Sequence, residues 1–366
     1  MQIRRSLAPV FVMTTLAAAG AQAQSSYNLY GVVDLTLGSF QYSGTEAGTD
    51  NKRITKVDGN QMVTSYIGFK GVEDLGGGLK AGFVLESFLR PDTGASGRND
   101  TLTSGNTVVK RADVFWGRAS NVYLQSDLGK LTLGRQGNLL FSHALGYNPF
   151  VAAFGLSPTI RLTFGKWGND KGDSGWSNAL TYQTPNLGGF MATVQAQFDE
   201  SPDDSEKPSY AVGASYVAGP FAVGAAWQTV RSASDPMLDL TMGQRQNFGL
   251  LGVSYDFGVV KLMGQFGKID NSGYAGGARI ETTLYQLGAS VPVTKDGKLL
   301  ASFGQSKEKA VEGGTTPDTR HSILTVAYDH WLSKRTDLYV AVMLDDEKLP
   351  GFKKGTTYVT GMRHSF

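Results

Sequence analysis

The chain of 366 residues contains no cysteine. This absence excludes a disulfide framework, a thiolate metal site and a cysteine nucleophile. Long apolar runs are also missing, because after residue 23 no stretch approaches 18 uninterrupted apolar residues. Transmembrane helices are therefore excluded from that part of the chain.

Acidic residues are absent from one long window. Residues 128–169 contain no Asp or Glu, although the whole chain has 32 of them. The window instead carries Lys130, Arg135, Arg161 and Lys166 among many apolar and aromatic residues. Composition alone does not explain this window, so its position in the fold has to be found first.

The N-terminus has the features of a secretory signal. Arg4 and Arg5 precede an apolar run at residues 7–19, and Ala21 and Ala23 have the small side chains that signal peptidase requires. We therefore expect residues 1–23 to be a cleaved signal peptide and residues 24–366 to form one unit. Without the two arginines, 32 Lys+Arg balance 32 Asp+Glu, so charge gives no reason to expect a nucleic-acid partner.

Alternation of apolar and polar residues is the dominant pattern of the mature chain. In residues 79–90 one parity reads Leu79, Ala81, Phe83, Leu85, Ser87, Leu89, and the other reads Lys80, Gly82, Val84, Glu86, Phe88, Arg90. Such a strand has one face in an apolar medium and the other in water. Because a soluble sandwich gives a similar pattern, alternation alone does not identify the medium.

Turn spacing separates the two alternatives. Tight-turn signals recur at 73–77, 126–129, 185–189, 217–220, 256–258, 295–297 and 332–335, and longer polar stretches lie between them. Short turns at one end and long loops at the other are typical of a bacterial outer-membrane β-barrel, in which every strand edge is paired.

Counting the segments predicts sixteen antiparallel strands in an all-β transmembrane barrel. They are expected at 27–43, 61–72, 79–90, 113–126, 130–137, 175–184, 190–199, 210–217, 221–231, 245–256, 259–269, 280–291, 298–307, 320–331, 337–346 and 356–366. A barrel of this size has a wide interior. The turns at Asp127 and Asn186 are 59 residues apart, which leaves a surplus in the loop that follows the fifth strand. We expect this third long loop to fold into the lumen.

Several segments resemble the trimeric general porins of Gram-negative bacteria, in particular the branch from Neisseria- and Burkholderia-like bacteria. They are residues 29–34 (LYGVVD), 67–80 (IGFKGVEDLGGGLK), 131–136 (LTLGRQ), 332–339 (LSKRTDLY) and 361–366 (GMRHSF). The resemblance implies a homotrimer in the outer membrane, with membrane lipid, lipopolysaccharide and the barrel-assembly machinery as further partners. It implies diffusion of ions and small hydrophilic solutes through a pore with opposed wall cations and loop carboxylates, without catalysis.

The resemblance also suggests which side chains form the pore wall. Arg135 matches the wall arginine of the fifth strand, whereas Tyr66 stands where this branch often has arginine. Lys70, Lys80 and Arg90 have inward parity on the second and third strands. Lys70 and Lys80 are expected in the periplasmic vestibule beside a short turn, and Arg90 nearer the constriction.

The loop carboxylates of the family are missing here, so Arg161 and Lys166 become loop cations without a local acid partner. Such a pore edge should favour anions. If Glu86, Asp34 and Asp113 face the lumen, their negative charges would offset the positive charge of the loop cations. Two alternatives stay open: the loop cations point to the solvent side of the loop, or Arg135 is a girdle or interface residue.

The last strand ends in an aromatic residue. Phe366 has the same parity as His364 and would lie outward at the periplasmic aromatic girdle, whereas Gly361 has the opposite parity. A C-terminal aromatic residue resembles the signal read by the outer-membrane assembly machinery.

Other chemistry finds little support. The four histidines are scattered, and no Gly-x-Ser triplet continues to the glycine of a nucleophile elbow, so no metal, cofactor or enzymatic activity is expected. An outer-membrane enzyme or an adhesin remains a distant alternative. Within the porin class, the alternative is a substrate-selective channel for small anionic or aromatic solutes.

Overall fold

The computed structural model describes residues 25–366 except 47, 49–50, 98–101, 105–106, 110–114, 165–173, 199–207, 232–244, 273–278 and 313–317. Residues 1–24 lie outside the described part, so the signal peptide at 1–23 stays a prediction. Within the described residues, no helix is both long and apolar enough to cross a membrane.

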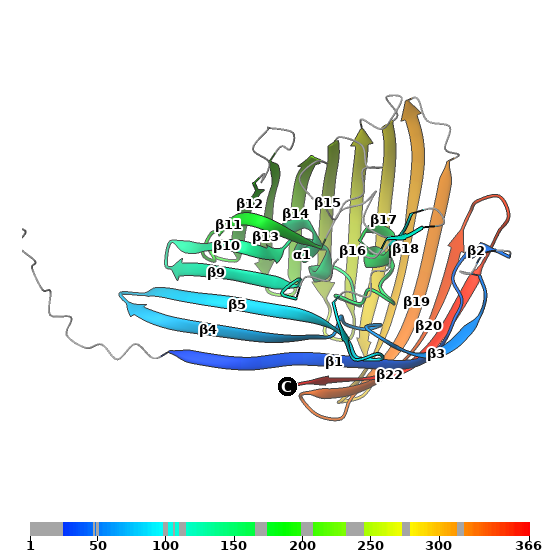
Figure 1. Ribbon diagram of the computed structural model, residues 1–366, viewed down its shortest axis with the longest axis horizontal. Coiled ribbons are helices and arrows are strands. Elements are labelled where there is room, and N and C mark those ends of the chain that lie inside the picture. Colours follow the sequence, from blue (N-terminus) through cyan, green and yellow to red (C-terminus); the bar gives the residue numbers. More distant parts are fainter. Residues whose placement is uncertain are drawn as a thin grey trace, which may run out of the picture.

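Sixteen long strands form a closed antiparallel barrel (Figure 1). β1 pairs with β22 on one side and with β4 on the other, which closes the ring. The ring strands are β1 (Ser26–Phe40), β4 (Tyr66–Gly76), β5 (Leu79–Arg90), β9 (Ala119–Ser126), β10 (Gly129–Gly137), β11 (Gly175–Gln183), β12 (Phe190–Gln197), β13 (Ser209–Ala218), β14 (Phe221–Arg231), β15 (Arg245–Asp256), β16 (Lys261–Ser272), β17 (Arg279–Pro292), β18 (Gly297–Glu312), β19 (Thr319–Trp331), β20 (Thr336–Glu347) and β22 (Gly355–Ser365).

The predicted sixteen-stranded antiparallel barrel is confirmed, and most strand boundaries agree within a few residues. Three boundaries differ more: β4 begins at Tyr66 rather than 61, β9 begins at Ala119 rather than 113, and β18 continues to Glu312 rather than 307. Short strands in the connections were not predicted. They are β2 (Gly44–Thr45), β3 (Ile54–Gly59), β6 (Ala95–Ser96), β7 (Leu102–Ser104), β8 (Thr107–Val109) and β21 (Phe352–Lys353).

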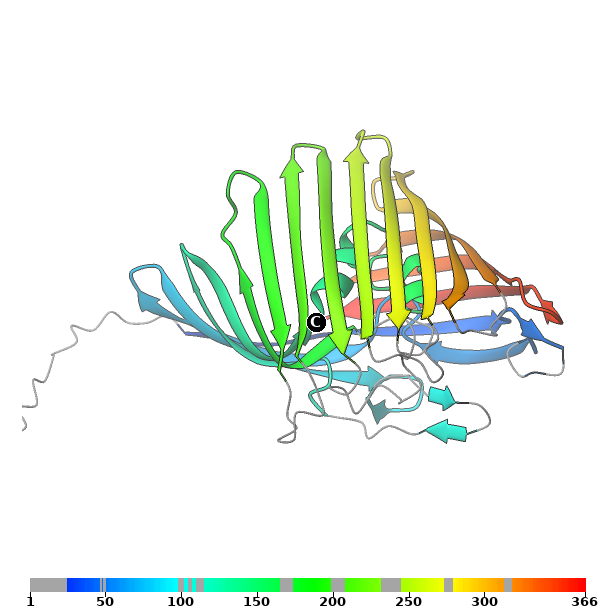
Figure 2. The same cartoon turned by 90° about the horizontal axis from the view of Figure 1, so that it is seen from above.

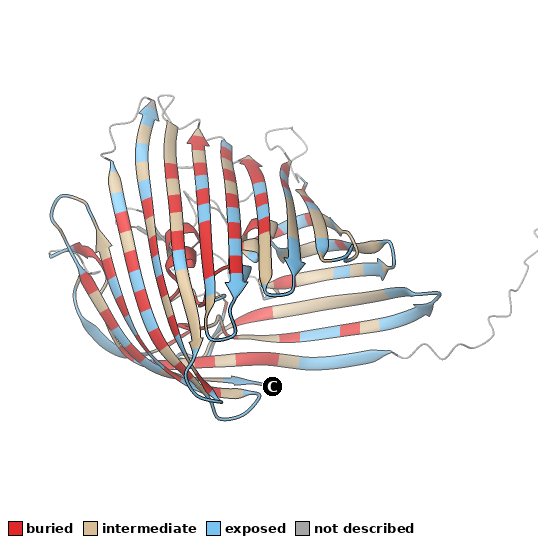
Figure 3. Cartoon of the chain, turned by 180° about the vertical axis from the view of Figure 1, so that it is seen from behind, coloured by how far each residue is buried: buried red, intermediate tan, exposed pale blue. Residues whose placement is uncertain are grey.

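The two faces of the barrel differ in exposure and chemistry. On β20 the side chains of Leu338, Val340, Val342 and Leu344 are exposed, and those between them are buried. The same alternation runs along most strands (Figure 3). Exposed apolar side chains therefore form the outer face, as lipid contact requires, and the opposite parity forms the inner face.

Short turns join the strands at one end. At the turn between β4 and β5, Gly76, Gly77 and Gly78 have φ values of 83°, 60° and 81°, which side chains other than glycine rarely adopt. The glycine run thus makes a turn, as the sequence predicts. Strands β12–β18 stand side by side as a curved wall (Figure 2).

The connection after β10 contains two helices, α1 (Leu139–Gly146) and α2 (Pro158–Thr163). α1 contacts β12–β15, and α2 contacts β17–β19. The side chains that meet this connection have inner-face parity, such as Gln228, Gln265 and Thr325. Residues 138–164, the inner segment below, therefore lie against the inner face of this wall.

Candidate functional site

The helices of the inner segment are capped by side chains that also attach the segment to the wall. Asn138 accepts a hydrogen bond from the Phe141 amide at 3.0 Å and donates to Gln228 Oε1 at 2.8 Å. Ser157 caps α2 by accepting from the Ile160 amide, and Pro158 follows in its first turn. Both caps are neutral side chains, and neither helix has an acidic residue in its first turn.

Glycines of the wall allow the inner segment to approach closely. A Cβ atom at Gly252 would lie 2.3 Å from the Tyr147 ring, and one at Gly304 would lie 2.9 Å from Pro158. Two hydrogen bonds fix the same contact: Gln265 donates to the Ala144 carbonyl at 2.9 Å, and Thr325 donates to the Leu156 carbonyl at 2.8 Å.

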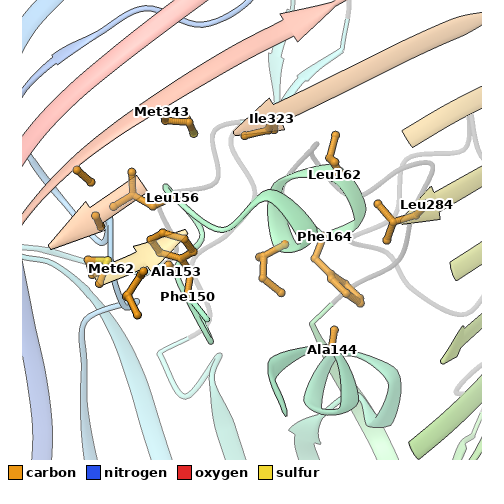
Figure 4. Close-up of a cluster of buried hydrophobic side chains, with 14 of the residues drawn as sticks. Met62, Ala144, Phe150, Ala153, Leu156, Leu162, Phe164, Leu284, Ile323 and Met343 are labelled. Carbon is orange, nitrogen blue, oxygen red and sulfur yellow. The ribbon is translucent and has the colours of Figure 1, made fainter. Parts of the chain in front are cut away.

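A hydrophobic cluster then holds the inner segment in place (Figure 4). Phe150, Leu156, Leu162 and Phe164 are almost fully buried in it. The wall and the 60–65 turn contribute Leu284, Ile323, Met343 and Met62. Burial of several large apolar side chains, each contributing roughly 1.5–3 kcal/mol, gives this connection one defined position.

Arg161 has an acidic partner on the barrel wall. Its Nη2 atom lies 3.7 Å from Asp345 Oδ2, and its guanidinium lies 4.6 Å from the centre of the Tyr42 ring. Asp345 also binds His321 Nε2 at 2.5 Å. Arg161 thus has no acidic partner nearby in the sequence, as expected, but the fold brings it to Asp345; its pore role stays a prediction.

A second charged cluster occupies the inner face of β1, β4 and β5. Arg118, which immediately precedes β9, forms an ion pair with Glu86 at 2.8 Å and lies 4.2 Å from the centre of the Tyr66 ring. Tyr30 donates a hydrogen bond to the other oxygen of Glu86 at 2.6 Å. The Glu86 side chain is 14% exposed and that of Arg118 31%, so both remain accessible to solvent.

Two lysines extend this cluster along the same wall. Lys70 Nζ lies 4.6 Å from the centre of the Tyr30 ring, and Lys130 Nζ lies 4.0 Å from that of Tyr123. Lys70 and Lys80 are exposed and lie toward the short turn at residues 77–78. Their location fits the expected vestibule, and that role stays a prediction.

Arg135 lies at an irregular point of β10. It pairs with Ser120 of β9, but the register with β11 shifts between Gly134 and Gln136, so the alternation does not fix the face of its side chain. Its side chain donates hydrogen bonds to the Gly117 carbonyl and to Ser177 Oγ, the latter at 2.7 Å. The wall position expected for Arg135 and the girdle or interface alternative therefore both stay predictions.

Asp34 does face inward, but solvent does not reach it. Its carboxylate is 0% exposed, accepts hydrogen bonds from the amides of Met62 and Val63 at 2.7 and 2.9 Å, and accepts one from Tyr339 Oη at 2.6 Å. Asp34 thus anchors the 60–65 turn to the wall. A carboxylate engaged in this way has little direct contact with a passing ion.

The remaining expected site residues divide into placed and unplaced groups. Arg90 is the last residue of β5, at the long-loop end of the strand, where its carbonyl accepts a hydrogen bond from the Gly94 amide at 2.8 Å. Asp113 and Lys166 lie outside the described residues. Their pore roles, like that of Arg90, stay predictions.

The C-terminal strand has the expected parity. His364 and Phe366 are exposed with Met362, and Gly361 has the opposite parity, against the Tyr339 ring. The Phe366 backbone exchanges two hydrogen bonds with Gly31 of β1. Pairing of the final residue with β1 completes the closure of the barrel.

Arg118 is the functional candidate that sequence reasoning missed. Within an alternating strand from residue 113 it would share the parity of Val122 and Leu124, which face outward. The strand begins only at Ala119, so the alternation does not reach Arg118, whose side chain turns toward Glu86. The complementary acid on the inner parity of β5 is the one signal that could have found it.

Two titratable side chains of the inner segment have shifted pKa values, and burial raises the pKa of one of them, Tyr147. Burial lowers the pKa of His143, which packs against Gly224 and Tyr147. Among the described residues, no three of His, Asp and Glu gather as metal ligands.

The comparisons with known proteins agree with this architecture. The sequence profile of the Gram-negative porin family matches residues 10–348. Outer membrane porin protein 32 of Delftia acidovorans is 33% identical over 340 residues, which cover 90% of this chain and 87% of that protein. An outer membrane porin protein of Bordetella pertussis is 26% identical over 401 residues, which cover 95% of this chain and 96% of that protein. The solved structure of an anion-selective porin from Comamonas acidovorans has a TM-score of 0.76 at 27% identity and covers 94% of this chain and 100% of that one. The chain therefore belongs to the Gram-negative porin family and is an outer-membrane porin.

Proposed function

We propose that the chain forms a passive diffusion channel with a weak preference for anions and that no chemical step accompanies transport. One observation carries the anion preference: the wall from β4 to β10 has an excess of inner-face cations. Five cations, Lys70, Lys80, Arg90, Arg118 and Lys130, stand there against two acids, Asp74 and Glu86. Such a wall lowers the barrier for anions.

The inner segment supplies the narrowing that gives this charge its effect. Its contacts with β12–β19 fill part of the space inside the ring. Ions passing the segment are then confined toward the opposite wall, where Glu86 and Arg118 pair. Fixed charges act most strongly where ions pass close to them, because water and salt screen them at longer range.

The source of the preference differs from that suggested by the acid-free window. Arg161 is paired with Asp345, so the described part of the inner segment adds little net charge. The similar porin from Comamonas acidovorans is anion-selective, which supports the same sign for this chain. The preference proposed here depends on the wall rather than on the loop.

A second candidate function is selective passage of small aromatic anions. Three inner-face cations lie over aromatic rings: Lys70 over Tyr30, Arg118 over Tyr66 and Lys130 over Tyr123. A benzoate-like solute could place its carboxylate on a cation and its ring beside an aromatic side chain. This arrangement favours an affinity for such solutes within the same channel.

Planar-bilayer recording tests both proposals. For the purified protein we expect ohmic conductance steps, grouped in threes if the porin is the homotrimer that the resemblance implies, and a reversal potential of the anion-selective sign in a KCl gradient. Absence of conductance would refute the channel, and a cation-selective potential would refute the wall argument.

The second candidate is tested by adding sodium benzoate. Selective binding predicts concentration-dependent current block by benzoate, with much weaker block by acetate at the same concentration. Equal effects of the two salts would leave only the general diffusion channel. Membrane lipid and the barrel-assembly machinery remain proposed partners for folding rather than for transport.

A further inference from the structure

One residue of the inner segment has a backbone conformation that its side chain disfavours. Val151 has a φ of 46°, in the left-handed region that β-branched residues almost never occupy. Among the described residues, the other positive-φ positions that are not glycine are Asn60 and Asn178, and asparagine tolerates this region. Val151 is therefore strained, at a position where asparagine or glycine would fit with less strain.

A buried asparagine holds the strained turn in place. Asn148 is 2% exposed and donates hydrogen bonds to the Ala144 carbonyl at 2.9 Å and to the Val151 carbonyl at 3.2 Å. Its Oδ1 atom accepts hydrogen bonds from the Phe150 amide at 3.0 Å and from Ser157 Oγ at 3.1 Å. These contacts fix the backbone on both sides of the turn, which is the setting in which local strain persists.

The strained turn exposes an apolar side chain. Val151 is 53% exposed, whereas Phe150 before it and Ala153 after it are buried in the hydrophobic cluster (Figure 4). The inner segment lies against the inner face of the wall, so the solvent on its free side is the water of the lumen. The Val151 side chain therefore faces the pore, where a polar side chain would be better hydrated.

The accessible side chains around Val151 are apolar as well. Phe141 and Phe154 are half-buried, with ring centres 5.6 Å apart, and Ala152 is half-buried next to Val151 in the chain. We call Phe141, Val151, Ala152 and Phe154 the apolar shelf. Residues 138–164 contain no acid, and their single arginine is paired with the wall. The free side of the inner segment thus offers apolar surface instead of charge.

The apolar shelf and the remaining wall suit different parts of one solute. The inner segment contacts β12–β19, and the wall from β4 to β10 carries the excess of cations, among them Arg118 and Lys130. An anionic group is attracted to these cations. Water beside an apolar side chain is poorly ordered, so an apolar group gains free energy by displacing it. A solute that suits both surfaces has one negative charge and an apolar chain.

We propose that the apolar shelf binds the alkyl chain of small carboxylates as they cross the pore, and that Val151 determines this preference. The inference rests on the proposed diffusion channel and adds a class of solute that the cations and aromatic rings of the wall do not select. Contact with apolar surface is non-directional and grows with the area covered, so a flexible alkyl chain is sufficient and an aromatic ring is not required.

Current block in planar bilayers tests the proposal on the full protein. Acetate, butanoate and hexanoate are added to a KCl solution, and the dissociation constant of block is measured for each. Complete burial of a methylene group strengthens binding about fourfold, so contact on one side should give about twofold. Hexanoate, which has four more methylenes than acetate, should therefore block about 16-fold more tightly, with butanoate between them.

The variant Val151→Asn separates the solute contact from the fold. Asparagine adopts the left-handed conformation more readily than valine, so the variant should unfold at a higher urea concentration than wild type. Loss of the apolar contact with about two methylenes should reduce the preference for hexanoate over acetate about fourfold. The conductance in KCl alone should stay unchanged, because both side chains are uncharged and similar in size.

A matched control valine lies outside the pore. Val259 is 75% exposed in the short turn between β15 and β16, so Val259→Asn removes an exposed valine of the same kind. The control variant should keep the wild-type preference for hexanoate. Partition of hexanoate into the bilayer affects all variants equally and therefore does not alter the comparison. Phe154→Ser tests the apolar shelf outside the strained turn and should also reduce the preference for hexanoate.

The possible failures are distinguishable. Absence of conductance steps in KCl would refute the channel itself. Normal steps with equal block by acetate, butanoate and hexanoate would leave the channel and overturn the apolar shelf. A preference for hexanoate that is the same in wild type, Val151→Asn and Phe154→Ser would also overturn it, because the alkyl chain would then bind elsewhere.

Discussion

Replacing Glu86 with glutamine should increase the anion selectivity of the channel, and replacing Arg118 with glutamine should decrease it. The two side chains form one ion pair at 2.8 Å on the inner face. Their opposite charges therefore largely cancel for an ion that is not in contact with them. Glu86→Gln leaves a net charge of +1, and Arg118→Gln leaves −1. Neither substitution removes all local contacts, because Arg118 keeps the Tyr66 ring and Glu86 keeps the Tyr30 hydroxyl.

The expected size follows from Coulomb's law with screening. A unit charge about 8 Å from the ion path contributes about 0.5 kcal/mol in water. At 0.1 M salt the Debye length is about 10 Å, which reduces this to about 0.2 kcal/mol. The permeabilities of the anion and of the cation then change in opposite directions, by about 1.5-fold each. The permeability ratio should therefore shift about twofold upward for Glu86→Gln and about twofold downward for Arg118→Gln, relative to wild type.

Reversal potentials in a KCl gradient measure this ratio directly. The shifts should become much smaller at 1 M salt, where the Debye length is about 3 Å. Arg335→Gln serves as the matched arginine control, since Arg335 is exposed in the short turn between β19 and β20. The reasoning fails if the two substitutions shift the potential in the same direction, or if Arg335→Gln has the larger effect.

Three further substitutions test how the wall and the inner segment are held. Gly361→Ala would put a Cβ atom 2.4 Å from the Tyr339 ring and should lower the free energy of unfolding in urea by about 1–3 kcal/mol through overpacking. Arg161→Ala removes the contacts with Asp345 and Tyr42 and should cost about 1 kcal/mol in the same assay. Burial lowers the pKa of His143 in the folded protein, so as the pH falls the unfolded chain binds the proton before the folded chain does. The stabilising contribution of neutral His143 is therefore complete above about pH 6.5 and decreases below it. His143→Gln should weaken this pH dependence of the free energy of unfolding. An unchanged urea midpoint, or for His143→Gln an unchanged pH profile, would contradict the corresponding expectation.

The barrel itself could be predicted almost completely from the sequence. Buried and more exposed residues alternate in β15 from Arg245 to Ser254, and the predicted bounds of β14 and β15 agree with the observed Phe221–Arg231 and Arg245–Asp256. A strand between lipid and water requires this pattern at every position, because a register error of one residue would exchange the two faces. The alternation of apolar and polar residues is therefore a strong signal wherever a strand has lipid on one face and water on the other.

The inner segment could be located but not described in the same way. Its surplus length predicted an insertion after the fifth strand, and the absence of acids suggested free cations. Asp345 follows Arg161 by 184 positions, and only the folded barrel brings the two together. The partners of Asp34 could not be predicted either. It accepts hydrogen bonds from Met62 and Val63, and no local sequence pattern predicts that their segment lies against β1.

The arginines show why the candidate site is harder to predict than the fold. Arg118 lies one residue before β9, and Arg135 lies next to Gly134, whose φ of 114° accompanies an irregular register with β11. At such points the backbone leaves the extended alternation, so parity no longer gives the face of a side chain. Wall charges near the constriction belong to strand ends that adjoin long loops, where bulges and early terminations are common. The residues that we propose to set ion selectivity therefore lie where the alternation of strand residues says least about orientation. For Arg118, its ion-pair partner Glu86 identifies the face instead.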